Sequence, residues 1–300
     1  MSSWRRDDPV ELADGTLVCG DHRSVRCGIC CVDYSFMLDS GDFGDGGDEE
    51  DGGDEEEGGR EDEDDDSDCN GSDDSHCALN HRPPPVTGPV TQFFPDEPND
   101  TPQALFRPGF SGPYERFIRR SDVKELLVYT DGACLDNGGQ FSKAGCAFVY
   151  GPGTPNVVRD CNFRLETKGP TGQTGQQTSN RAELRAVIAA MEFKPWTVEG
   201  FRRVIVATDS QYVVQGVISW TNRWMNNGWR TSNGHPVKNK DLWEYLLETI
   251  SLRHEEGLQI QLWQISRRLN TEADRLAKEA AASHELDQNY TKLSGVCCWN

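Results

Sequence analysis

The sequence lacks any apolar run long enough to cross a membrane or to resemble a signal peptide. We therefore expect an intracellular protein, nuclear or cytoplasmic, that has no membrane partner and is a monomer. Disulfides are not expected either, since the 11 cysteines are an odd number in a chain without a sign of secretion. The length of 300 residues allows one good-sized domain or two small ones.

Basic residues are scarce, with 30 Lys and Arg against 50 Asp and Glu, which gives a formal net charge of −20. Most of the negative charge lies in one segment, because residues 42–74 hold 19 acidic residues against the single Arg60, a net charge of −18. From Lys124 to Ser283 there are 19 basic and 17 acidic residues, a net charge of +2. The overall charge therefore does not exclude a nucleic-acid partner for the folded part.

An acidic tract at residues 42–78 is almost without apolar side chains, so it buries too little surface to offset the entropy of an ordered chain. We expect a disordered acidic N-terminal arm here. The tract would bind basic partners, mimic nucleic acid or act as a plain solvating linker, and its composition leaves these roles open. We expect residues 79–116, rich in proline, to form an irregular linker before a folded domain at 117–284 and a tail at 285–300.

Four candidate zinc ligands stand within residues 1–41 in the pattern Cys-x2-His-x4-Cys-x2-Cys, namely Cys19, His22, Cys27 and Cys30. Two pairs of soft ligands would close a tetrahedral Zn²⁺ site, and the metal would fold a segment too small for its own core. The middle spacing of four residues is short for such a site. Free thiols in a flexible arm are the alternative interpretation.

Two apolar runs end in Thr-Asp, at residues 126–131 and 204–209. Runs rich in branched side chains predict buried strands, and each run would carry an aspartate at its carboxyl end. Two such strands in one sheet would place Asp131 and Asp209 side by side. Paired carboxylates of this kind are typical of a site for hard divalent cations.

The surrounding pattern predicts an α/β fold with a mixed five-stranded sheet and flanking helices. The first apolar run would form a three-strand meander with two following strands, and two further strands would come later. The strands after the first are expected at residues 144–150, 157–165, 204–209 and 258–265. Helices are expected at residues 180–192, from 210, at 238–252 and from 271.

Two further acids stand near helix starts, Glu183 three residues after Asn180 and Asp274 three residues after Thr271. An acid at this offset supports a helix N-terminus by capping and by its interaction with the helix dipole. Taken singly, each acid is as well explained by this structural role as by catalysis.

Four motifs stand in order along one domain-sized segment: Thr-Asp-Gly, Asn-Arg-Ala-Glu-Leu, Thr-Asp-Ser and Asn-x-x-x-Asp-x-Leu-Ala. In this combination, residues 125–283 resemble the ribonuclease H family, specifically the type 1 enzymes. The resemblance implies a ribonuclease-H-like fold and an endonuclease that hydrolyses the RNA strand of RNA/DNA hybrids, leaving 5′-phosphate and 3′-hydroxyl ends. It also implies two Mg²⁺ ions, replaceable by Mn²⁺, held by the catalytic carboxylates Asp131, Glu183, Asp209 and Asp274.

The resemblance further implies residues that contact the hybrid. We expect Asn137, Ser179 and Asn180 to contact the minor groove and the RNA 2′-hydroxyls. Thr178 and Asn239, with Gln176, are expected at a phosphate of the DNA strand. Tyr212 and Trp220 are expected to pack against the DNA sugars. Gln176 replaces an arginine found in some members. Trp224, Trp229 and Thr231 lie in a basic, aromatic segment that suits a nucleic-acid backbone, although the two tryptophans are equally well explained as partly core.

The chain departs from the better-known family members in the loop before the final helix. Residues 263–270 form a shorter loop without the histidine that assists water activation or product release in those members. Arg267 or Arg268 is expected to take part of that role. The N-terminal hybrid-binding domain of eukaryotic relatives is also not visible in the sequence. A catalytically impaired module that binds hybrids or double-stranded RNA is therefore the alternative function.

Overall fold

The computed structural model describes residues 90–295, apart from 154–156, 232–233 and 285–286, together with a few residues near the N-terminus. The latter include two antiparallel pairs of two-residue strands: β1 (Val10–Glu11) with β2 (Leu17–Val18), and β3 (Arg26–Cys27) with β4 (Val32–Asp33). The acidic tract, Cys19, His22 and Cys30 lie outside the described residues, and the Cys27 side chain is also not described. Among the helices that are described, none is long and apolar enough to span a membrane.

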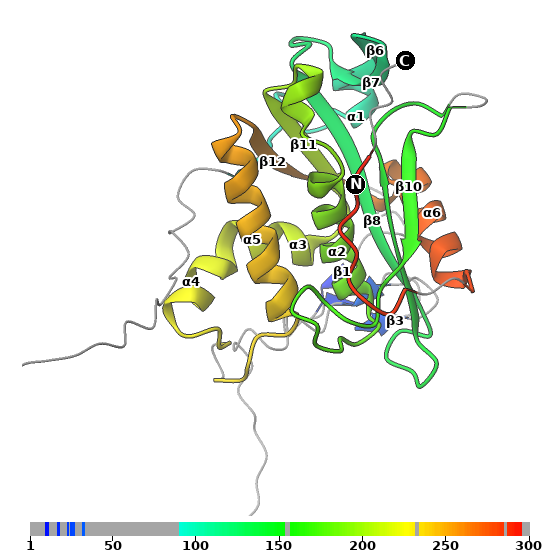
Figure 1. Cartoon of the computed structure of the whole chain (residues 1–300), viewed down its shortest axis with the longest axis vertical. Coiled ribbons are helices and arrows are strands. Elements are labelled where there is room, and N and C mark those ends of the chain that lie inside the picture. Colours follow the sequence, from blue (N-terminus) through cyan, green and yellow to red (C-terminus); the bar gives the residue numbers. More distant parts are fainter. Residues whose placement is uncertain are drawn as a thin grey trace, which may run out of the picture.

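A mixed sheet forms the centre of the fold (Figure 1). Its main strands lie in the order β10-β9-β8-β11-β12-β5. They are β5 (Val90–Gln92), β8 (Glu125–Leu135), β9 (Lys143–Val149), β10 (Asp160–Arg164), β11 (Arg203–Thr208) and β12 (Gln259–Gln264). The strands β8, β9 and β10 form the predicted antiparallel meander, while β11 and β12 run parallel to β8. The predicted ribonuclease-H-like arrangement is therefore confirmed.

Helices cover both faces of this sheet. They are α2 (Ser179–Glu192), α3 (Gln211–Gln215), α4 (Thr221–Asn226), α5 (Lys240–Glu255) and α6 (Thr271–Ala282), with a π-helical turn (Gly216–Trp220) joining α3 to α4. In Figure 1, α2, α3 and α5 lie on one side of the sheet and α6 on the other. Alternate side chains of each strand point to opposite faces. Leu126 and Val128 accordingly join the core under α2 and α5, while Leu127 packs on the opposite face.

The segment expected as an irregular linker is folded where it is described, and this expectation was wrong. Strand β5 extends the sheet edge by pairing with β12. Helix α1 (Pro102–Leu105) leads into a hairpin of β6 (Phe106–Ser111) and β7 (Tyr114–Arg119), and β7 pairs with β8. The sheet therefore has eight strands rather than five. The physical reason is burial: Phe93 and Phe106 pack with Trp263 on the sheet face opposite α2 and α5. Pro108 is tolerated because β6 pairs only with β7.

The described part of the C-terminal tail, residues 287–295, also belongs to the folded domain. Arg185 is fully buried, donates to both carboxylate oxygens of Glu166 and donates to the carbonyl oxygen of Thr291 at 2.7 Å. The Tyr290 ring covers the guanidinium of Arg185 at 4.3 Å, and the Tyr290 hydroxyl donates to Glu192. The expectation of a separate tail is therefore corrected, because a buried charge on α2 needs these partners.

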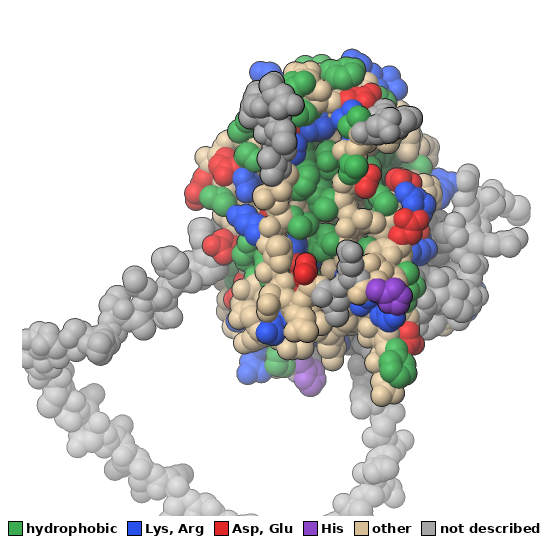
Figure 2. Space-filling model, turned by 45° about the vertical axis from the view of Figure 1, so that its right-hand side comes forward, with side chains coloured by type: hydrophobic (Ala, Val, Ile, Leu, Met, Phe, Trp, Pro, Cys, Tyr) green, Lys and Arg blue, Asp and Glu red, His purple; other side chains and the backbone are tan. Residues whose placement is uncertain are grey.

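Charged side chains of both signs are interspersed around an apolar band on the face shown in Figure 2. This mixture agrees with the small net charge counted from Lys124 to Ser283. The strong negative charge of the chain therefore resides mainly outside this domain.

Candidate active site

Three carboxylates from three elements converge at one edge of the sheet. Asp131 lies in β8, Glu183 in α2 and Asp209 directly after β11, and one oxygen of each lies within 4.8 Å of the others. Parallel pairing of β8 with β11 ends at Tyr129 and Ala207, so both aspartates stand just beyond the paired ends. Strand β8 itself continues to Leu135, further than predicted, because β9 pairs with its second half.

Gly132 allows α2 to come close enough to complete this cluster. A Cβ at Gly132 would lie 2.1 Å from the Glu183 backbone nitrogen and 2.3 Å from the carbonyl carbon of Ala182. Only a residue without a side chain fits between β8 and the helix backbone. The glycine after Asp131 therefore sets the distance between Asp131 and Glu183.

The cluster is electrostatically costly in the absence of a cation. Asp131 and Glu183 are only 2% and 9% exposed, and burial raises the pKa of both carboxyls well above the usual range. The negative charge of Asp209 raises both pKa values further. Within the described part of the chain, Oε2 of Glu183 is buried without a hydrogen-bond partner. A carboxylate-only donor set with an unpartnered oxygen fits a hard divalent cation.

Asn270 holds two of the carboxylates in place, a role that the sequence reasoning missed. Its Nδ2 donates to Asp209 Oδ1 at 2.7 Å, to Asp131 Oδ1 at 3.4 Å and to the carbonyl oxygen of Thr130 at 3.0 Å. Asn270 is also the N-cap residue of α6, but its side chain makes no capping bond. The asparagine that opens the Asn-x-x-x-Asp motif was the available signal.

Asp274 does not join the cluster of three. Its Oδ1 accepts from Arg267 Nη2 at 2.5 Å, and its Oδ2 accepts from Lys278 Nζ at 2.8 Å. Arg267 lies in a 3-10 turn (Arg267–Leu269) before α6, whereas Arg268 is exposed. Burial alone would lower the pKa of Arg267, but the charges of Asp209, Asp131 and Asp274 raise it. Arg267 therefore remains cationic beside the carboxylates.

The two helix-start acids differ in their structural role. Helix α2 begins at Ser179, and the N-cap Thr178 accepts a hydrogen bond from the Arg181 backbone N–H, so Glu183 lies beyond the first turn. Capping therefore does not explain Glu183. Asp274 does lie in the first turn of α6, where a carboxylate also favours the helix dipole.

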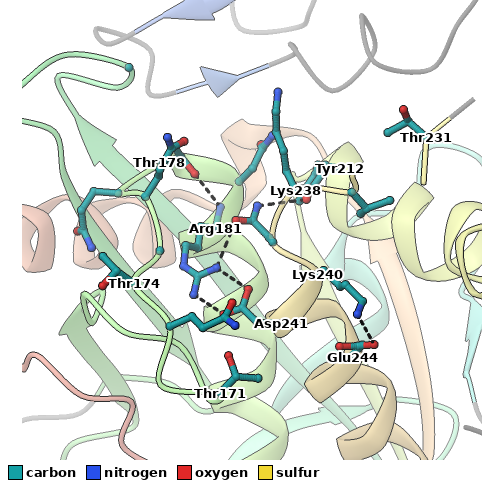
Figure 3. A pocket seen from close by; sticks show the side chains of 18 of the residues that line it. Thr171, Thr174, Thr178, Arg181, Tyr212, Thr231, Lys238, Lys240, Asp241 and Glu244 are labelled. Atoms are coloured by element: carbon teal, nitrogen blue, oxygen red, sulfur yellow. Dashed lines mark hydrogen bonds and ion pairs between the residues drawn. The ribbon is translucent and has the colours of Figure 1, made fainter. Parts of the chain in front are cut away.

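A pocket of about 1000 Å³ is lined by Asn180 and Arg181 in the first turn of α2 and by segments around α3, α4 and α5 (Figure 3). Nine of the eleven expected substrate-binding residues line it: Asn137, Gln176, Thr178, Asn180, Tyr212, Trp220, Trp224, Thr231 and Asn239. Ser179 does not line it, but its hydroxyl accepts from Asn137 Nδ2 at 2.8 Å. Trp229, also outside the lining, packs against Trp224 with ring centroids 6.3 Å apart.

The pocket wall is organised by an ion pair that the sequence reasoning did not find. Arg181 Nη1 and Nη2 donate to the two Asp241 oxygens at 2.8 and 2.6 Å, which joins the start of α2 to the start of α5 (Figure 3). A Cβ at Gly175 would lie 2.2 Å from Nε of Arg181. Asn239, in a left-handed conformation with φ of 57°, donates to the Tyr212 hydroxyl at 3.3 Å. In the sequence, the available signals for the Arg181–Asp241 pair were the arginine of Asn-Arg-Ala-Glu-Leu and the aspartate shortly after Asn239.

Trp224 and Trp229 are both partly buried against the main core. Trp224 packs against Trp220 and Trp243 with ring centroids 5.6 and 5.5 Å apart. The partly-core alternative therefore describes their packing, while Trp224 also lines the pocket.

A mixed sheet that brings buried carboxylates to one edge, beside a polar and aromatic pocket, is an arrangement that fits the metal-dependent phosphoryl-transfer enzymes, a class that includes nucleases. The RNase H family model matches residues 123–282. The chain therefore belongs to the ribonuclease H family and is an endoribonuclease, a hydrolase acting on RNA.

Among its relatives is the ribonuclease H of the bacterium Dinoroseobacter shibae, 37% identical over 160 residues that cover 53% of this chain and 93% of that protein. The mouse ribonuclease H1 is 36% identical over 167 residues, 54% of this chain, and the match spans only 52% of the mouse protein. The solved structure of LC9-RNase H1, a type 1 RNase H with the type 2 active-site motif, is 27% identical and covers 56% of this chain and 77% of that one, with a TM-score of 0.39.

Proposed function

We propose that this ribonuclease H cuts the RNA strand of RNA/DNA hybrids endonucleolytically, with Mg²⁺ as its natural metal and Mn²⁺ as a substitute, leaving 5′-phosphate and 3′-hydroxyl ends. The observation that carries the proposal is the convergence of Asp131, Glu183 and Asp209 within 4.8 Å. The neighbouring pocket supplies a surface for the hybrid. The carboxylate cluster does not contribute to folding stability, because buried like charges destabilise a fold unless a cation neutralises them.

Asp131, Glu183 and Asp209 would hold the divalent ions, with Asp274 as the fourth carboxylate. Bound Mg²⁺ would lower the pKa of an attacking water and neutralise charge on the scissile phosphate. Asn270 keeps Asp131 and Asp209 at fixed positions through its amide group. Such supporting hydrogen bonds orient metal ligands and tune their affinity.

Arg267, rather than Arg268, is our candidate for the role of the missing histidine. Its guanidinium reaches the carboxylate edge and pairs with Asp274, whereas Arg268 is exposed on the same turn. An arginine stays charged and cannot accept a proton at neutral pH. We therefore assign Arg267 to stabilising negative charge or assisting product release, and not to activating water as a base.

The pocket would bind the hybrid through two kinds of side chain. Asn137 and Asn180 present short polar groups suited to RNA 2′-hydroxyls, which distinguish RNA from DNA. Thr178 and Asn239 would bind a phosphate of the DNA strand. Tyr212, with Trp220 and Trp224, offers flat surfaces for sugars.

We also propose that Cys19, His22, Cys27 and Cys30 bind one Zn²⁺ ion. The support is their spacing, and the presence of two short strand pairs around them, with β2 ending one residue before Cys19 and Cys27 lying in β3. Metal analysis of the full chain tests this assignment. One zinc per wild-type chain and none in Cys27→Ser would support it, and equal zinc content in both would contradict it.

The substrate assignment is tested with one end-labelled RNA, presented to the full chain single-stranded, paired with RNA and paired with DNA, in Mg²⁺ and in Mn²⁺. We expect cleavage of the RNA/DNA hybrid alone, with fragments whose 3′ ends are free hydroxyls. Binding of the hybrid without cleavage in either ion would contradict the proposal and leave the binding module in its place. Equal cleavage of all three substrates would contradict the hybrid specificity.

A further inference from the structure

We propose that Lys278, together with Arg267, holds Asp274 away from the other three carboxylates and so makes metal loading sequential. One divalent cation enters the cluster of Asp131, Glu183 and Asp209, and a second binds only when Asp274 exchanges its two cationic partners for the ion. This inference rests on the proposed metal-dependent function of the same carboxylates.

The two cationic partners occupy both oxygens of Asp274. Arg267 Nη2 lies 2.5 Å from Oδ1, and Lys278 Nζ lies 2.8 Å from Oδ2. In contrast, one carboxylate oxygen each of Asp131, Glu183 and Asp209 lies within 4.8 Å of the others, and Oε2 of Glu183 has no hydrogen-bond partner among the described residues. A first ion therefore needs no ion pair to open at Asp274, whereas a second ion liganded by Asp274 does.

The backbone under Asp274 is fixed, so the exchange involves side chains alone. Ala273 and Ala277 are buried where α6 packs on the sheet. A Cβ at Gly145 of β9 would lie 2.4 Å from the Ala277 carbonyl oxygen, which shows how closely the helix approaches the strand. Helix α6 therefore cannot shift easily, and only the Asp274 rotamer and its two partners remain free to change.

The spacing of residues along helix α6 brings Lys278 next to Asp274. Lys278 stands four residues after Asp274, so the two side chains lie on one face with the acid nearer the N-terminus, the favourable order for such a pair. Arg267 reaches the other oxygen from the short turn that replaces the longer histidine-containing loop. The sequence pattern Arg267-x6-Asp274-x3-Lys278 thus encodes the clamp.

The Lys278 side of the clamp is open to water. The Lys278 side chain is 39% exposed and that of Arg267 is 22% exposed. The Lys278–Asp274 pair therefore contributes little, because solvent screens it and the two side chains lose entropy, whereas the Arg267–Asp274 pair is partly buried. A divalent cation that already has three carboxylates nearby competes successfully for Asp274 when its concentration is sufficient.

The test is a calorimetric titration of the full chain with Mn²⁺, comparing wild type, Lys278→Met and Arg275→Met. Arg275 is the matched control, because it lies on the same helix and carries the same charge but pairs with Glu272 and Glu279. We expect two binding steps in wild type. In Lys278→Met the second dissociation constant should fall about two- to fivefold, as loss of one exposed ion pair predicts, with the first unchanged.

A rescue variant and a fold measurement complete the design. Lys278→Arg should restore the wild-type second step, and circular dichroism should show the same fold in all variants. An unchanged second step in Lys278→Met, or an equal shift in Arg275→Met, would overturn the clamp while leaving two bound ions and the proposed function intact. Absence of any Mn²⁺ binding to wild type would instead overturn the proposed function, and the clamp with it.

Discussion

Asn270 Nδ2 lies 2.7 Å from Asp209 Oδ1, so the residue that precedes α6 is tied to the residue that follows β11. The same amide reaches Asp131 and the Thr130 carbonyl oxygen. One neutral side chain therefore aligns the two aspartates and joins the last helix to the centre of the sheet.

Asn270→Ala should weaken both stability and activity. We expect the free energy of unfolding to fall by about 1–3 kcal/mol, because the Thr130 carbonyl oxygen and the two aspartates lose the hydrogen bonds that Asn270 donates. Cleavage should fall about 10–100-fold, the usual effect of removing a residue that orients a metal ligand. Urea unfolding and hybrid cleavage measure the two effects. Thr271→Ala, at the exposed neighbouring position, is the control and should change neither.

Gly132→Ala should disrupt the carboxylate cluster more than it disrupts folding. The added methyl group would meet the backbone of α2 at Glu183 and force the helix away from β8. Overpacking of this kind costs about 1–3 kcal/mol in stability. Gly145→Ala is the matched control, because its methyl group would meet the backbone of α6 instead. Mn²⁺ titration should show a weakened first binding step in Gly132→Ala, and the account fails if Gly145→Ala weakens that step equally.

The metal-free protein should become less stable as the pH rises above about 4, where a free carboxyl begins to ionise. Burial and neighbouring charges raise the pKa of Asp131 and Glu183, so the folded state binds more protons than the unfolded state above that pH. The free energy of unfolding then decreases with pH, by about 1.4 kcal/mol for each unit of raised pKa. Urea unfolding in a chelator at about pH 5 and about pH 8 measures the slope.

Asp131→Asn is the decisive variant for this pH dependence. It removes one buried titrating group and relieves the repulsion on Glu183, so the slope should become shallower and the variant should exceed wild type in stability near pH 8 in chelator. Mg²⁺ should stabilise wild type and have much less effect on the variant. A slope identical to that of wild type would show that the cluster is not the source of the pH dependence.

Removal of the strands before residue 120 should destabilise the domain. Phe106 is 3% exposed and packs with Trp263 and Leu127. Phe106→Ala should therefore cost about 3–5 kcal/mol. Phe110→Ala, on the same hairpin but 71% exposed, is the control and should cost little. A fragment limited to residues 123–282, the span of the family match, should melt at a lower temperature than the full chain.

The elements around the candidate active site were predictable because their signals are local. Alternating or continuous apolar runs predicted β8, β9, β11 and β12, and the final helix begins at Thr271 as expected. The convergence of Asp131 and Asp209 followed from parallel strands with carboxylates at corresponding ends. These features depend on periodicity within one element, which a single sequence displays.

The features that were missed depend on contacts between distant segments. Strand β5 pairs with β12 across about 170 residues, as in the Gln261–Thr91 hydrogen bond. Strand β6 contains Pro108 followed by Gly109, a pair that suggests a turn rather than a strand. The docking of Tyr290 on Arg185 has no local signature either. The separation of Asp274 from the cluster was also unforeseen, because the sequence shows the acid but not which cations reach it.

The measurement that tests the central claim most directly is hybrid cleavage by the full chain and by Asp209→Asn in Mg²⁺, with hybrid affinity measured for both by gel shift. Asp209→Asn is a suitable variant, because asparagine keeps the shape of the aspartate side chain and removes its charge. The account predicts that wild type cuts only the RNA strand, whereas Asp209→Asn binds the hybrid and leaves it intact. Cleavage by Asp209→Asn at the wild-type rate would contradict the claim that these carboxylates hold the catalytic metal.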